Sequence, residues 1–441
     1  MGGEWQNVTL GDLFNVKHGF AFKGEYFVDD PTETLLVTPG NFAIGGGFQN
    51  TKPKFYNGPI PEEYVLRPGQ VVVTMTDLSK QSDTLGLAAV IPKDQNVWLH
   101  NQRVGLLEFE GRMASDPRFL SYLLRTHEYR SWVVGSATGT TVKHTSPSRI
   151  QNYSCSIPPL SEQKSIAHIL GTLDDKIELN RQMNATLEAM AQALFKSWFV
   201  DFDPVIDNAL AAGNPIPDEL QARAENRAAL GDKRKPLPEA MQQQFPSSFV
   251  FSEEMGWIPE GWEVGTLEDM IVLQRGFDLP KSQREDGCYP LMVASGQDGT
   301  HSEYKVKGPG ITTGRSGKLG DVNLVLQDFW PLNTTLWIKE YKRSSPYHAL
   351  YLLRSLALEK YNAGSAVPTL NRNHVHNIPL PAPPKRVVEL HESQAKDLYR
   401  KILFNVRQVE QLSKLRDTLL PKLLSGQLRI PEAETLVADA V

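Results

Sequence analysis

A glycine-rich stretch in the second half of the chain carries two cations where it should turn. The stretch reads Gly310-Ile-Thr-Thr-Gly314-Arg-Ser-Gly317-Lys318-Leu-Gly320. It does not predict nucleotide hydrolysis, because a Walker loop needs a glycine and a hydroxyl where this chain has Thr312 and Leu319. It instead predicts a tight hairpin with glycines at positive φ and with Arg315, Ser316 and Lys318 at its tip. The backbone N–H groups and both charges of such a turn can reach one phosphate or one base edge.

A second group of charged residues offers a different chemistry. Asp328 precedes the apolar run Thr335-Leu-Trp-Ile, and Glu340 and Lys342 follow it. Two carboxylates and a lysine around a metal ion can hydrolyse a phosphodiester, so these residues give a metal-dependent DNA nuclease as one alternative. The spacing is loose, and an Asp with a Glu-x-Lys occurs by chance in most chains of this length.

Other catalytic patterns are incomplete. Asp201-Phe-Asp203-Pro204-Val205 lacks the second proline and the aromatic residue of a methyltransferase loop, so we expect Pro204 to end a helix. His374 and His376 lie on alternate positions of an expected strand, but no cluster of cysteines or carboxylates accompanies them, which favours satisfied polar side chains over a metal site. There is no Gly-x-Ser-x-Gly nucleophile elbow. These gaps favour a protein whose chemistry is carried by another chain.

The composition is that of a globular protein with room for two or three domains. The chain has 441 residues, 40% of them hydrophobic, and a net charge of −5. It contains no run of 18 apolar residues and starts with no signal peptide. The two isolated cysteines, Cys155 and Cys288, are typical of a reducing cytoplasm. With so little net charge, any affinity for DNA must come from local patches of cations.

Two long helices must position these candidate residues. After Pro158-Pro159, apolar residues recur at alternating spacings of four and three, which predicts a coiled-coil helix. The pattern recurs 225 residues later, where Pro383-Pro384 take the place of the first proline pair. The first seam is Ile166, Leu170, Leu173, Ile177, Asn180, Asn184, Leu187, Ala191, Leu194 and Trp198, and the second is His391, Ala395, Leu398, Ile402, Asn405, Val409, Leu412, Arg416, Leu419 and Leu423.

The two seams predict an antiparallel coiled coil with a pseudo-two-fold axis. Parallel packing would bring both flanking globular stretches to the same DNA segment, whereas antiparallel packing would separate them. Under antiparallel symmetry only the midpoints of the helices face their own equivalents, and Asn180 and Asn405 lie near those midpoints. We therefore expect Asn180 and Asn405 to fix the register of the pair by a hydrogen bond between their side-chain amides.

Each helix follows a globular stretch, and the two stretches share short motifs. Trp262-Glu-Val-Gly-Thr-Leu267 repeats the pattern of Trp5-Gln-Asn-Val-Thr-Leu10, and Gly276-Phe277 repeats Gly19-Phe20. Gly364-Ser-Ala366 echoes Gly135-Ser-Ala137 near the far ends. Short β-rich runs with a helical insert at Pro117–Val134 predict an α+β fold. Because the middles of the two stretches barely match, we expect two related modules that recognise different things.

These patterns predict six segments. The long helices cover residues 161–203 and 386–426, and the modules that precede them cover residues 1–160 and 255–385. Between them, residues 204–254 form a mostly extended linker with one short helix near Asp218–Leu230. Residues 427–441 form a flexible, acidic tail.

The chain resembles the specificity subunits of type I restriction–modification enzymes. The resemblance is carried by Pro158-Pro-Leu-Ser-Glu-Gln163 before the first helix, by Leu194-Phe-Lys-Ser-Trp-Phe-Val-Asp-Phe-Asp-Pro204 at its end, and by Leu415-Arg-Asp-Thr-Leu-Leu-Pro-Lys-Leu-Leu-Ser-Gly-Gln-Leu428. Thr74-Met-Thr-Asp-Leu-Ser79 and Gly314-Arg-Ser-Gly-Lys-Leu-Gly-Asp-Val322 are similar to stretches of their target-recognition domains. The acidic, Pro/Gln-rich linker departs from the pattern.

The resemblance implies a non-catalytic DNA reader. Each target-recognition domain would contact one half of a split double-stranded DNA site, while the helices set the spacer. The helices would also dock two methyltransferase subunits carrying S-adenosylmethionine, and two restriction subunits that use ATP and Mg²⁺ could join. No cofactor would bind this chain itself. A purely structural coiled-coil scaffold is the competing class, but it does not explain why the middles of the two modules diverge.

We select the candidate DNA contacts from two kinds of polar segment in each module. Arg and Lys suit guanine and phosphate, whereas Asn and Gln suit adenine. In the second module the candidates are Arg315, Ser316 and Lys318 in the hairpin turn, with Asn371, Arg372 and Asn373 in the polar loop before the last strand. In the first module they are Thr76, Ser79, Lys80 and Gln81 in the comparable turn, with Lys143 and His144 in the comparable loop.

Overall fold

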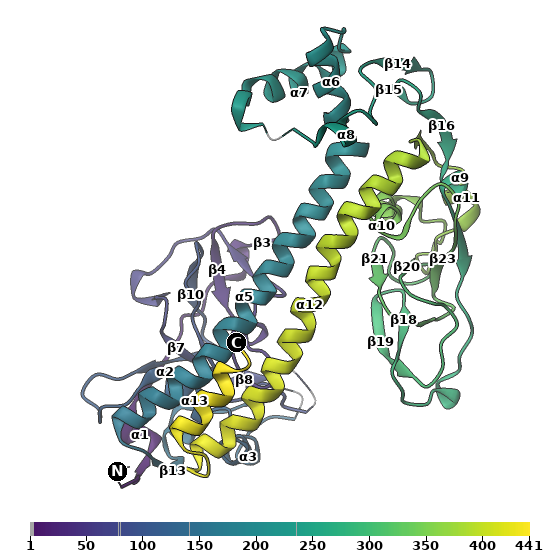
Figure 1. Cartoon of the computed structure of the whole chain (residues 1–441). Coiled ribbons are helices and arrows are strands. Elements are labelled where there is room, and N and C mark those ends of the chain that lie inside the picture. The colour runs from purple at the N-terminus through teal and green to yellow at the C-terminus, as the bar shows by residue number, and fades with distance from the viewer. Residues whose placement is uncertain (1–3, 78, 80, 141, 235) are drawn as a thin grey trace. The chain divides into compact units, whose positions relative to one another are not determined.

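The computed structural model describes residues 4–77, 79, 81–140, 142–234 and 236–441. The chain divides into two compact units, residues 1–181 with 406–441 and residues 182–405, which we call unit 1 and unit 2. Each unit holds one module together with one half of each of two long helices, α5 (Leu160–Phe199) and α12 (Lys385–Leu424) (Figure 1). The predicted α+β class is confirmed. No helix among the described residues is long and apolar enough to cross a membrane.

The module of unit 1 contains two sheets. The first has the strand order β2-β11-β7-β9 with antiparallel neighbours, and the second has the order β3-β5-β4-β10-β6. Val71 and Val73 pack toward the helices while Val72 packs toward the second sheet, so the central strand is apolar on both faces. The elements are β1 (Gln6–Thr9), α1 (Leu10–Leu13), β2 (Asn15–His18), β3 (Phe27–Val28), β4 (Thr34–Val37), β5 (Phe55–Tyr56), β6 (Val65–Leu66), β7 (Val71–Thr74), β8 (Thr76–Asp77), β9 (Ala88–Val90), β10 (Val97–His100), β11 (Val104–Glu108), α2 (Pro117–Leu123), α3 (His127–Gly135), β12 (Lys143–His144), α4 (Pro147–Gln151) and β13 (Ser154–Ile157).

The module of unit 2 repeats the first sheet with the order β17-β23-β20-β21, again antiparallel throughout. A three-stranded sheet, β19-β18-β22, replaces the larger second sheet of unit 1. The elements are β16 (Glu263–Thr266), α9 (Leu267–Met270), β17 (Ile271–Arg275), β18 (Tyr289–Val293), β19 (Gly296–His301), β20 (Gly310–Gly314), β21 (Val322–Val325), β22 (Trp330–Pro331), β23 (Thr335–Tyr341), α10 (Pro346–Ser355), α11 (Arg372–His376) and β24 (Pro379–Ala382).

The repeated sequence motifs have the same structural role in both modules. Thr9 and Thr266 each begin a short helix in a reciprocal capping box, with hydrogen bonds to Asp12 and Asp269 respectively. Each first strand then pairs antiparallel with the last strand of its module, β1 with β13 and β16 with β24. The shared motifs therefore close each module where it meets its long helix.

The long helices pack antiparallel in each unit, as predicted. In unit 1 the first half of α5 and the last half of α12 share one core, which includes Leu170, Leu173, Leu419 and Leu423. In unit 2 the last half of α5 and the first half of α12 share another core, which includes Ala191, Trp198, Val387, Ala395 and Tyr399.

The predicted hydrogen bond between Asn180 and Asn405 is wrong. Asn180 donates from Nδ2 to Oε1 of Gln408 at 2.9 Å in unit 1, whereas Asn405 donates from Nδ2 to Oδ1 of Asn184 at 2.8 Å in unit 2. Both predicted asparagines are buried. The register is displaced by about one helical turn from a midpoint-to-midpoint alignment. The seam thus has two polar layers, because Asn180 pairs with Gln408 and Asn405 pairs with Asn184. The positions of the helix midpoints alone do not predict these two partners.

The expected extended linker is folded. It contains α6 (Asp203–Ala212), α7 (Asp218–Ala229), α8 (Glu239–Gln242) and a hairpin of β14 (Phe249–Ser252) and β15 (Gly256–Pro259). Only α7 was predicted. Arg223 and Arg227, one turn apart on α7, bind Asp203 and Asp207, one turn apart on α6. This matched spacing orders a segment whose composition is typical of a linker.

The carboxyl-terminal segment is also folded. Residues Ile430–Ala438 form α13, and Ala433 and Val437 are buried in the core of unit 1. The prediction of a flexible tail is therefore wrong for these residues. Their two small apolar side chains lie one turn apart, which is enough to cover the end of the helix pair in unit 1.

Candidate nucleic-acid interface

The glycine-rich stretch of unit 2 forms the predicted hairpin between β20 and β21. Gly317 and Gly320 have positive φ in its turn. Gly314 is required for a different reason, because a Cβ there would overlap the carbonyl oxygen of Lys318. Arg315 donates from Nε to the carbonyl of Asn333 at 3.0 Å, and exposed Lys318 pairs with Asp321 at 2.6 Å. Such an exposed pair is weak, so Lys318 is free to move to a phosphate.

The second predicted segment lies beside this turn. The N–H of Gly317 donates to the carbonyl of Pro368 at 2.9 Å, and the N–H of Leu370 donates to the carbonyl of Arg315 at 2.8 Å. Asn371 follows directly and accepts the N–H of Asn373 at 3.0 Å as the cap of α11. Arg372 and Asn373 are exposed on the first turn of that helix. Asn371 therefore positions its neighbours, and its own oxygen is already in use.

The histidines after this loop lie on α11 and not on a strand, which corrects the prediction. His376 is buried and accepts the N–H of Leu273 at 2.9 Å through Nε2, whereas His374 is exposed. Asn371 is a strong helix cap, and the short helix that follows it was missed because its five residues carry no apolar period.

The candidates of unit 1 also come together. Strands β8 and β12 pair antiparallel, which places Thr76 opposite His144 and Lys143 opposite Asp77. The hydroxyl of Thr76 lies 3.2 Å from Nδ1 of His144. Thr76 is buried and His144 is exposed, so the threonine orients the imidazole and the imidazole faces solvent.

The side chain of Asp77 stabilises the turn after β8 by hydrogen bonds. Its buried carboxylate accepts the N–H groups of Ser79 and Thr84, both at 2.6 Å. Burial raises the pKa of Asp77, but these hydrogen bonds outweigh burial and keep the pKa below its ordinary value. Arg130 binds the carbonyls of Ser82 and Leu85 from the other side. Ser79 and Gln81 thus sit on a braced turn; Lys80 lies outside the described residues.

Backbone hydrogen bonds show that the two junctions are equivalent. The N–H of Met75 donates to the carbonyl of Arg103, as the N–H of Arg315 donates to that of Thr334. The N–H of Thr145 donates to the carbonyl of Met75, as that of Leu370 donates to Arg315. Three segments therefore meet in the same way in both modules, although their side chains differ.

This equivalence also corrects one sequence alignment. A Cβ on Gly139 would overlap the carbonyl oxygen of Val142, and a Cβ on Gly364 would overlap that of Val367. Gly364 is thus the counterpart of Gly139 and not of Gly135. The repeat of Gly-Ser-Ala in the sequence therefore aligned Gly364 with the wrong glycine of unit 1.

Sequence reasoning missed one segment of the junction. Gln102 and Arg103 are exposed in the turn between β10 and β11, next to Met75. The signal for this turn was the repeated Gly-Phe motif, because Gly19 and Gly276 leave room for the backbone of Asn101 and Leu332. We add Gln102 and Arg103 to the candidate surface of unit 1.

The residues of the nuclease alternative serve other purposes. Asp328 accepts the N–H of Gly308 at 3.0 Å, whereas Glu340 lies near the end of β23 opposite Val272. Within the described ranges, no group of three His, Cys, Asp or Glu residues could hold a metal ion. This geometry gives the nuclease alternative no support.

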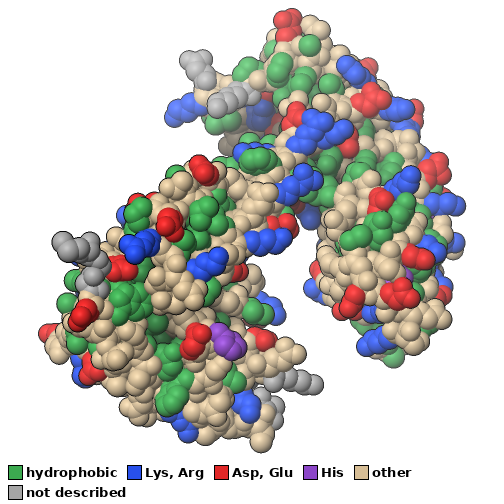
Figure 2. Space-filling view, turned by 60° about the horizontal axis from the view of Figure 1, so that its bottom comes forward, with side chains coloured by type: hydrophobic (Ala, Val, Ile, Leu, Met, Phe, Trp, Pro, Cys, Tyr) green, Lys and Arg blue, Asp and Glu red, His purple; other side chains and the backbone are tan. Residues whose placement is uncertain are grey.

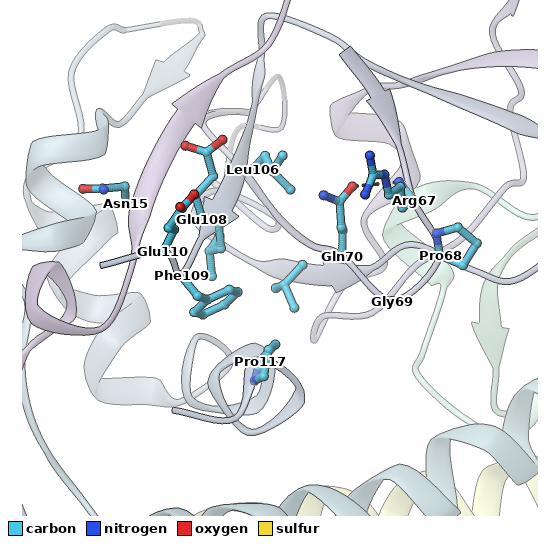
Figure 3. A pocket seen from close by; sticks show the side chains of 12 residues that line it. Asn15, Arg67, Pro68, Gly69, Gln70, Leu106, Glu108, Phe109, Glu110 and Pro117 are labelled. Carbon is cyan, nitrogen blue, oxygen red and sulfur yellow. Dashed lines mark hydrogen bonds between the residues drawn. The ribbon is translucent and has the colours of Figure 1, made fainter. Parts of the chain in front are cut away.

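The surface charge and a groove of unit 1 bear on where DNA could bind. Figure 2 shows basic and acidic side chains interspersed on the face drawn, as expected of a nearly neutral chain. An open groove in unit 1 is lined by Arg67, Gln70, Glu108, Phe109 and Glu110 (Figure 3). Its two glutamates would repel phosphate, and it contains none of the candidate DNA contacts.

Comparisons with known proteins all find similarity to one family. The family model of the type I restriction modification DNA specificity domain matches residues 2–189 and 259–412, so each match covers one module and part of a long helix. The HindI specificity subunit of a type I restriction enzyme from Haemophilus influenzae is 29% identical over 357 residues, which cover 71% of this chain and 77% of that protein. The MjaIX specificity subunit from Methanocaldococcus jannaschii is 26% identical over 339 residues, covering 71% and 69%.

A solved structure has the same fold. The S subunit of a type I restriction-modification system from M. genitalium matches with a TM-score of 0.55 and 16% identity, over 95% of this chain and 96% of that one.

Proposed function

Because the chain belongs to the family of type I restriction–modification DNA specificity domains, it is a DNA-recognition subunit and not an enzyme, and we propose that each module reads one half of a bipartite site. The observation that carries the proposal is the junction of three segments, which has the same backbone hydrogen bonds in both modules but exposes different side chains. A constant frame with variable tips suits two readers of different sequences.

We assign base and phosphate contacts to the exposed and half-buried members of each junction. In unit 2, Arg315 and Asn373 are suited to base edges, and Lys318 and Arg372 to phosphate. Ser316 and Asn371 position them. In unit 1 the contacts are Ser79, Gln81, Gln102, Arg103, Lys143 and His144, and Thr76 orients His144. Lys80, which lies outside the described residues, remains a candidate from the sequence.

We further propose that this chain acts in the cytoplasm as part of a larger assembly. Its helices, predicted at 161–203 and 386–426, would dock two methyltransferase subunits that bind S-adenosylmethionine. Two restriction subunits that use ATP and Mg²⁺ would complete the assembly. The modules would span residues 1–160 and 255–385, and the folded segment 204–254 would join them. The similarity to specificity subunits of type I restriction systems supports a restriction–modification partner.

The proposal is tested by finding the bases that the assembly modifies. The chain is co-expressed with the methyltransferase subunit of its host, and modified bases in the genomic DNA are sequenced. We expect one motif made of two short specific halves with unspecified bases between them. Modification at a continuous motif, or no modification that depends on this chain, would contradict the proposal.

A further inference from the structure

One helix of each module carries the same tetrapeptide where it meets the long helices. Tyr122-Leu-Leu-Arg125 spans the carboxyl-terminal end of α2 and the two residues after it in unit 1, and Tyr351-Leu-Leu-Arg354 lies in α10 in unit 2. The leucines of both tetrapeptides are buried in the cores. The tyrosine and the arginine point instead to polar groups of the long helices, and this is the part that packing does not explain.

In unit 1 the tetrapeptide binds a carboxylate of α5. Asp174 accepts the hydroxyl of Tyr122 at 2.8 Å and the guanidinium of Arg125 at 3.1 Å. It also accepts Arg416 of α12 at 2.8 Å. The side chain of Arg125 is only 4% exposed, and its guanidinium stacks on the ring of Tyr122. One carboxylate therefore joins the module to both long helices.

In unit 2 the equivalent residues bind a carboxylate of α5 from the other side. Glu188 accepts Arg354 at 2.6 Å and the hydroxyl of Tyr399 of α12 at 2.6 Å. The hydroxyls of Tyr351 and Tyr399 are 2.8 Å apart. Tyr399 is thus the partner of Tyr351, as Asp174 is the partner of Tyr122 in unit 1. Again one carboxylate, Glu188, joins the module to both long helices.

A second interaction shows how closely α2 fits its helix. Arg118 binds Asp175 at 2.5 Å and the carbonyl of Gly171 at 3.1 Å. Gly171 is the only glycine of α5, and a Cβ there would lie 2.6 Å from the guanidinium carbon of Arg118. A helix glycine is costly, and here it makes room for a contact between the module and the helix.

We propose that Tyr122 with Arg125, and Tyr351 with Arg354, are positioning residues that fix the orientation of each module on the helix pair. We call the two sets of contacts the Asp174 clamp and the Glu188 clamp. The clamps restrict the protein to one length of spacer between the two half-sites. A module that could tilt on its helices would also accept sites whose spacer is slightly shorter or longer. This inference rests on the proposed function, since it needs two half-sites whose spacing can be measured.

The test compares spacer lengths within one sample. The full chain is co-expressed with its methyltransferase subunit in cells that carry plasmids with both half-sites, separated by the native spacer or by one base pair more or fewer. Modification is counted at each spacer for the wild type, Tyr122→Phe and Tyr351→Phe. Each change removes one hydroxyl and keeps the ring. Since a ratio is measured, a lower amount of folded protein affects both spacers alike.

We expect each variant to raise modification at the altered spacers, relative to the native spacer, by roughly tenfold, which corresponds to about 1.4 kcal/mol. The half-site sequences should not change. The matched control is Tyr129→Phe, because the Tyr129 hydroxyl is buried in unit 1 without a hydrogen-bond partner among the described residues. This control should keep the spacer preference of the wild type.

Two results would overturn the inference. One is an unchanged spacer preference in both tyrosine variants, and the other is an equal loss at every spacer, which is the signature of a merely stabilising role. Failure of the proposed function looks different, because the wild type itself would then modify no bipartite site.

Discussion

The two units have the same backbone arrangement at the recognition junction and at the clamp, but they use different side chains there. At the recognition junction, Met75 and Arg315 occupy equivalent positions and make equivalent main-chain hydrogen bonds. At the Asp174 clamp a half-buried carboxylate binds two arginines, of which Arg125 is buried, whereas the Glu188 clamp relies on a pair of tyrosines and a half-exposed arginine. Main-chain bonds are indifferent to side-chain type, so the frame can persist while the residues at its tips change.

The difference between the clamps predicts the largest effect. Asp174→Ala should destabilise unit 1 by about 3 kcal/mol, because buried Arg125 loses its carboxylate and Arg416 keeps only Asp417. Glu188→Ala should cost about 1 kcal/mol, because Arg354 and Glu188 are each about one-third exposed. Hydrogen exchange in α2 and α10 measures the two losses. Equal losses would mean that burial does not distinguish the clamps.

A fall in pH should have the second largest effect, because it should lower the stability of the two units to different extents. His391 is buried in unit 2, where neither of its ring nitrogens has a hydrogen-bond partner among the residues that the structure describes, and burial lowers its pKa to about 3. His348 beside it has its pKa lowered by burial and by His391. Each unfolded histidine binds a proton below about pH 6.5. Stability is therefore present above that pH and is lost as the pH falls toward the folded pKa.

In unit 1, burial lowers the pKa of His100 to about 4, although Nε2 of His100 lies 2.8 Å from the carbonyl oxygen of Val104. Between pH 6.5 and 5 we expect each such histidine to cost about 2 kcal/mol, so unit 2 should weaken more than unit 1. Hydrogen exchange of both units at pH 7 and pH 5 gives the comparison. His391→Leu should reduce the acid sensitivity of unit 2, and an unaltered pH profile in this variant would contradict the assignment.

The recognition turns give a smaller effect. Arg315→Ala should weaken DNA binding of the assembly by about 1–3 kcal/mol and relax specificity at one base of one half-site. Lys318→Ala should weaken binding to all sequences alike and reduce its salt dependence. Binding titrations at two salt concentrations, on the recognised site and on single-base variants, separate these outcomes. A uniform loss in Arg315→Ala would make it a phosphate contact.

The polar layers of the helix pair give the smallest effect. Asn405→Leu alone should destabilise unit 2 by about 1–2 kcal/mol, because Asn184 loses its partner. The double change Asn184→Leu with Asn405→Leu should recover this loss. A double-mutant cycle in thermal unfolding measures the coupling. Additive effects would show that the amide pair does not set the register.

The sequence predicted the features that depend on neighbouring residues. The heptad seams, the repeated motif that ends in Thr9-Leu10 and Thr266-Leu267, and the hairpin near Gly317 all follow from local spacing. The Asp203 and Asp207 pairs with α7 were missed, because their partners lie a loop away and composition conceals them. The register of the helix pair was missed for the same reason, since Gln408 carries no seam signal.

The candidate site was predicted in part. Arg315, Lys318 and His144 were selected by residue type, and the structure brings their segments together as two junctions. Residue type alone could not tell that Thr76 and Asn371 are used internally, because burial and capping depend on the folded backbone. Arg103 was missed because its turn has no repeated side chain, only a repeated main-chain bond.

An exchange of one module tests the central claim most directly. Residues 261–385 are replaced by the same region of a related specificity subunit, and the modified bases are sequenced in cells that also express the methyltransferase subunit. We expect one half of the recognised motif to change to that of the donor, while the other half and the spacer length stay as they were. A change in both halves, or in neither, would contradict the account of two independent readers on one helical frame.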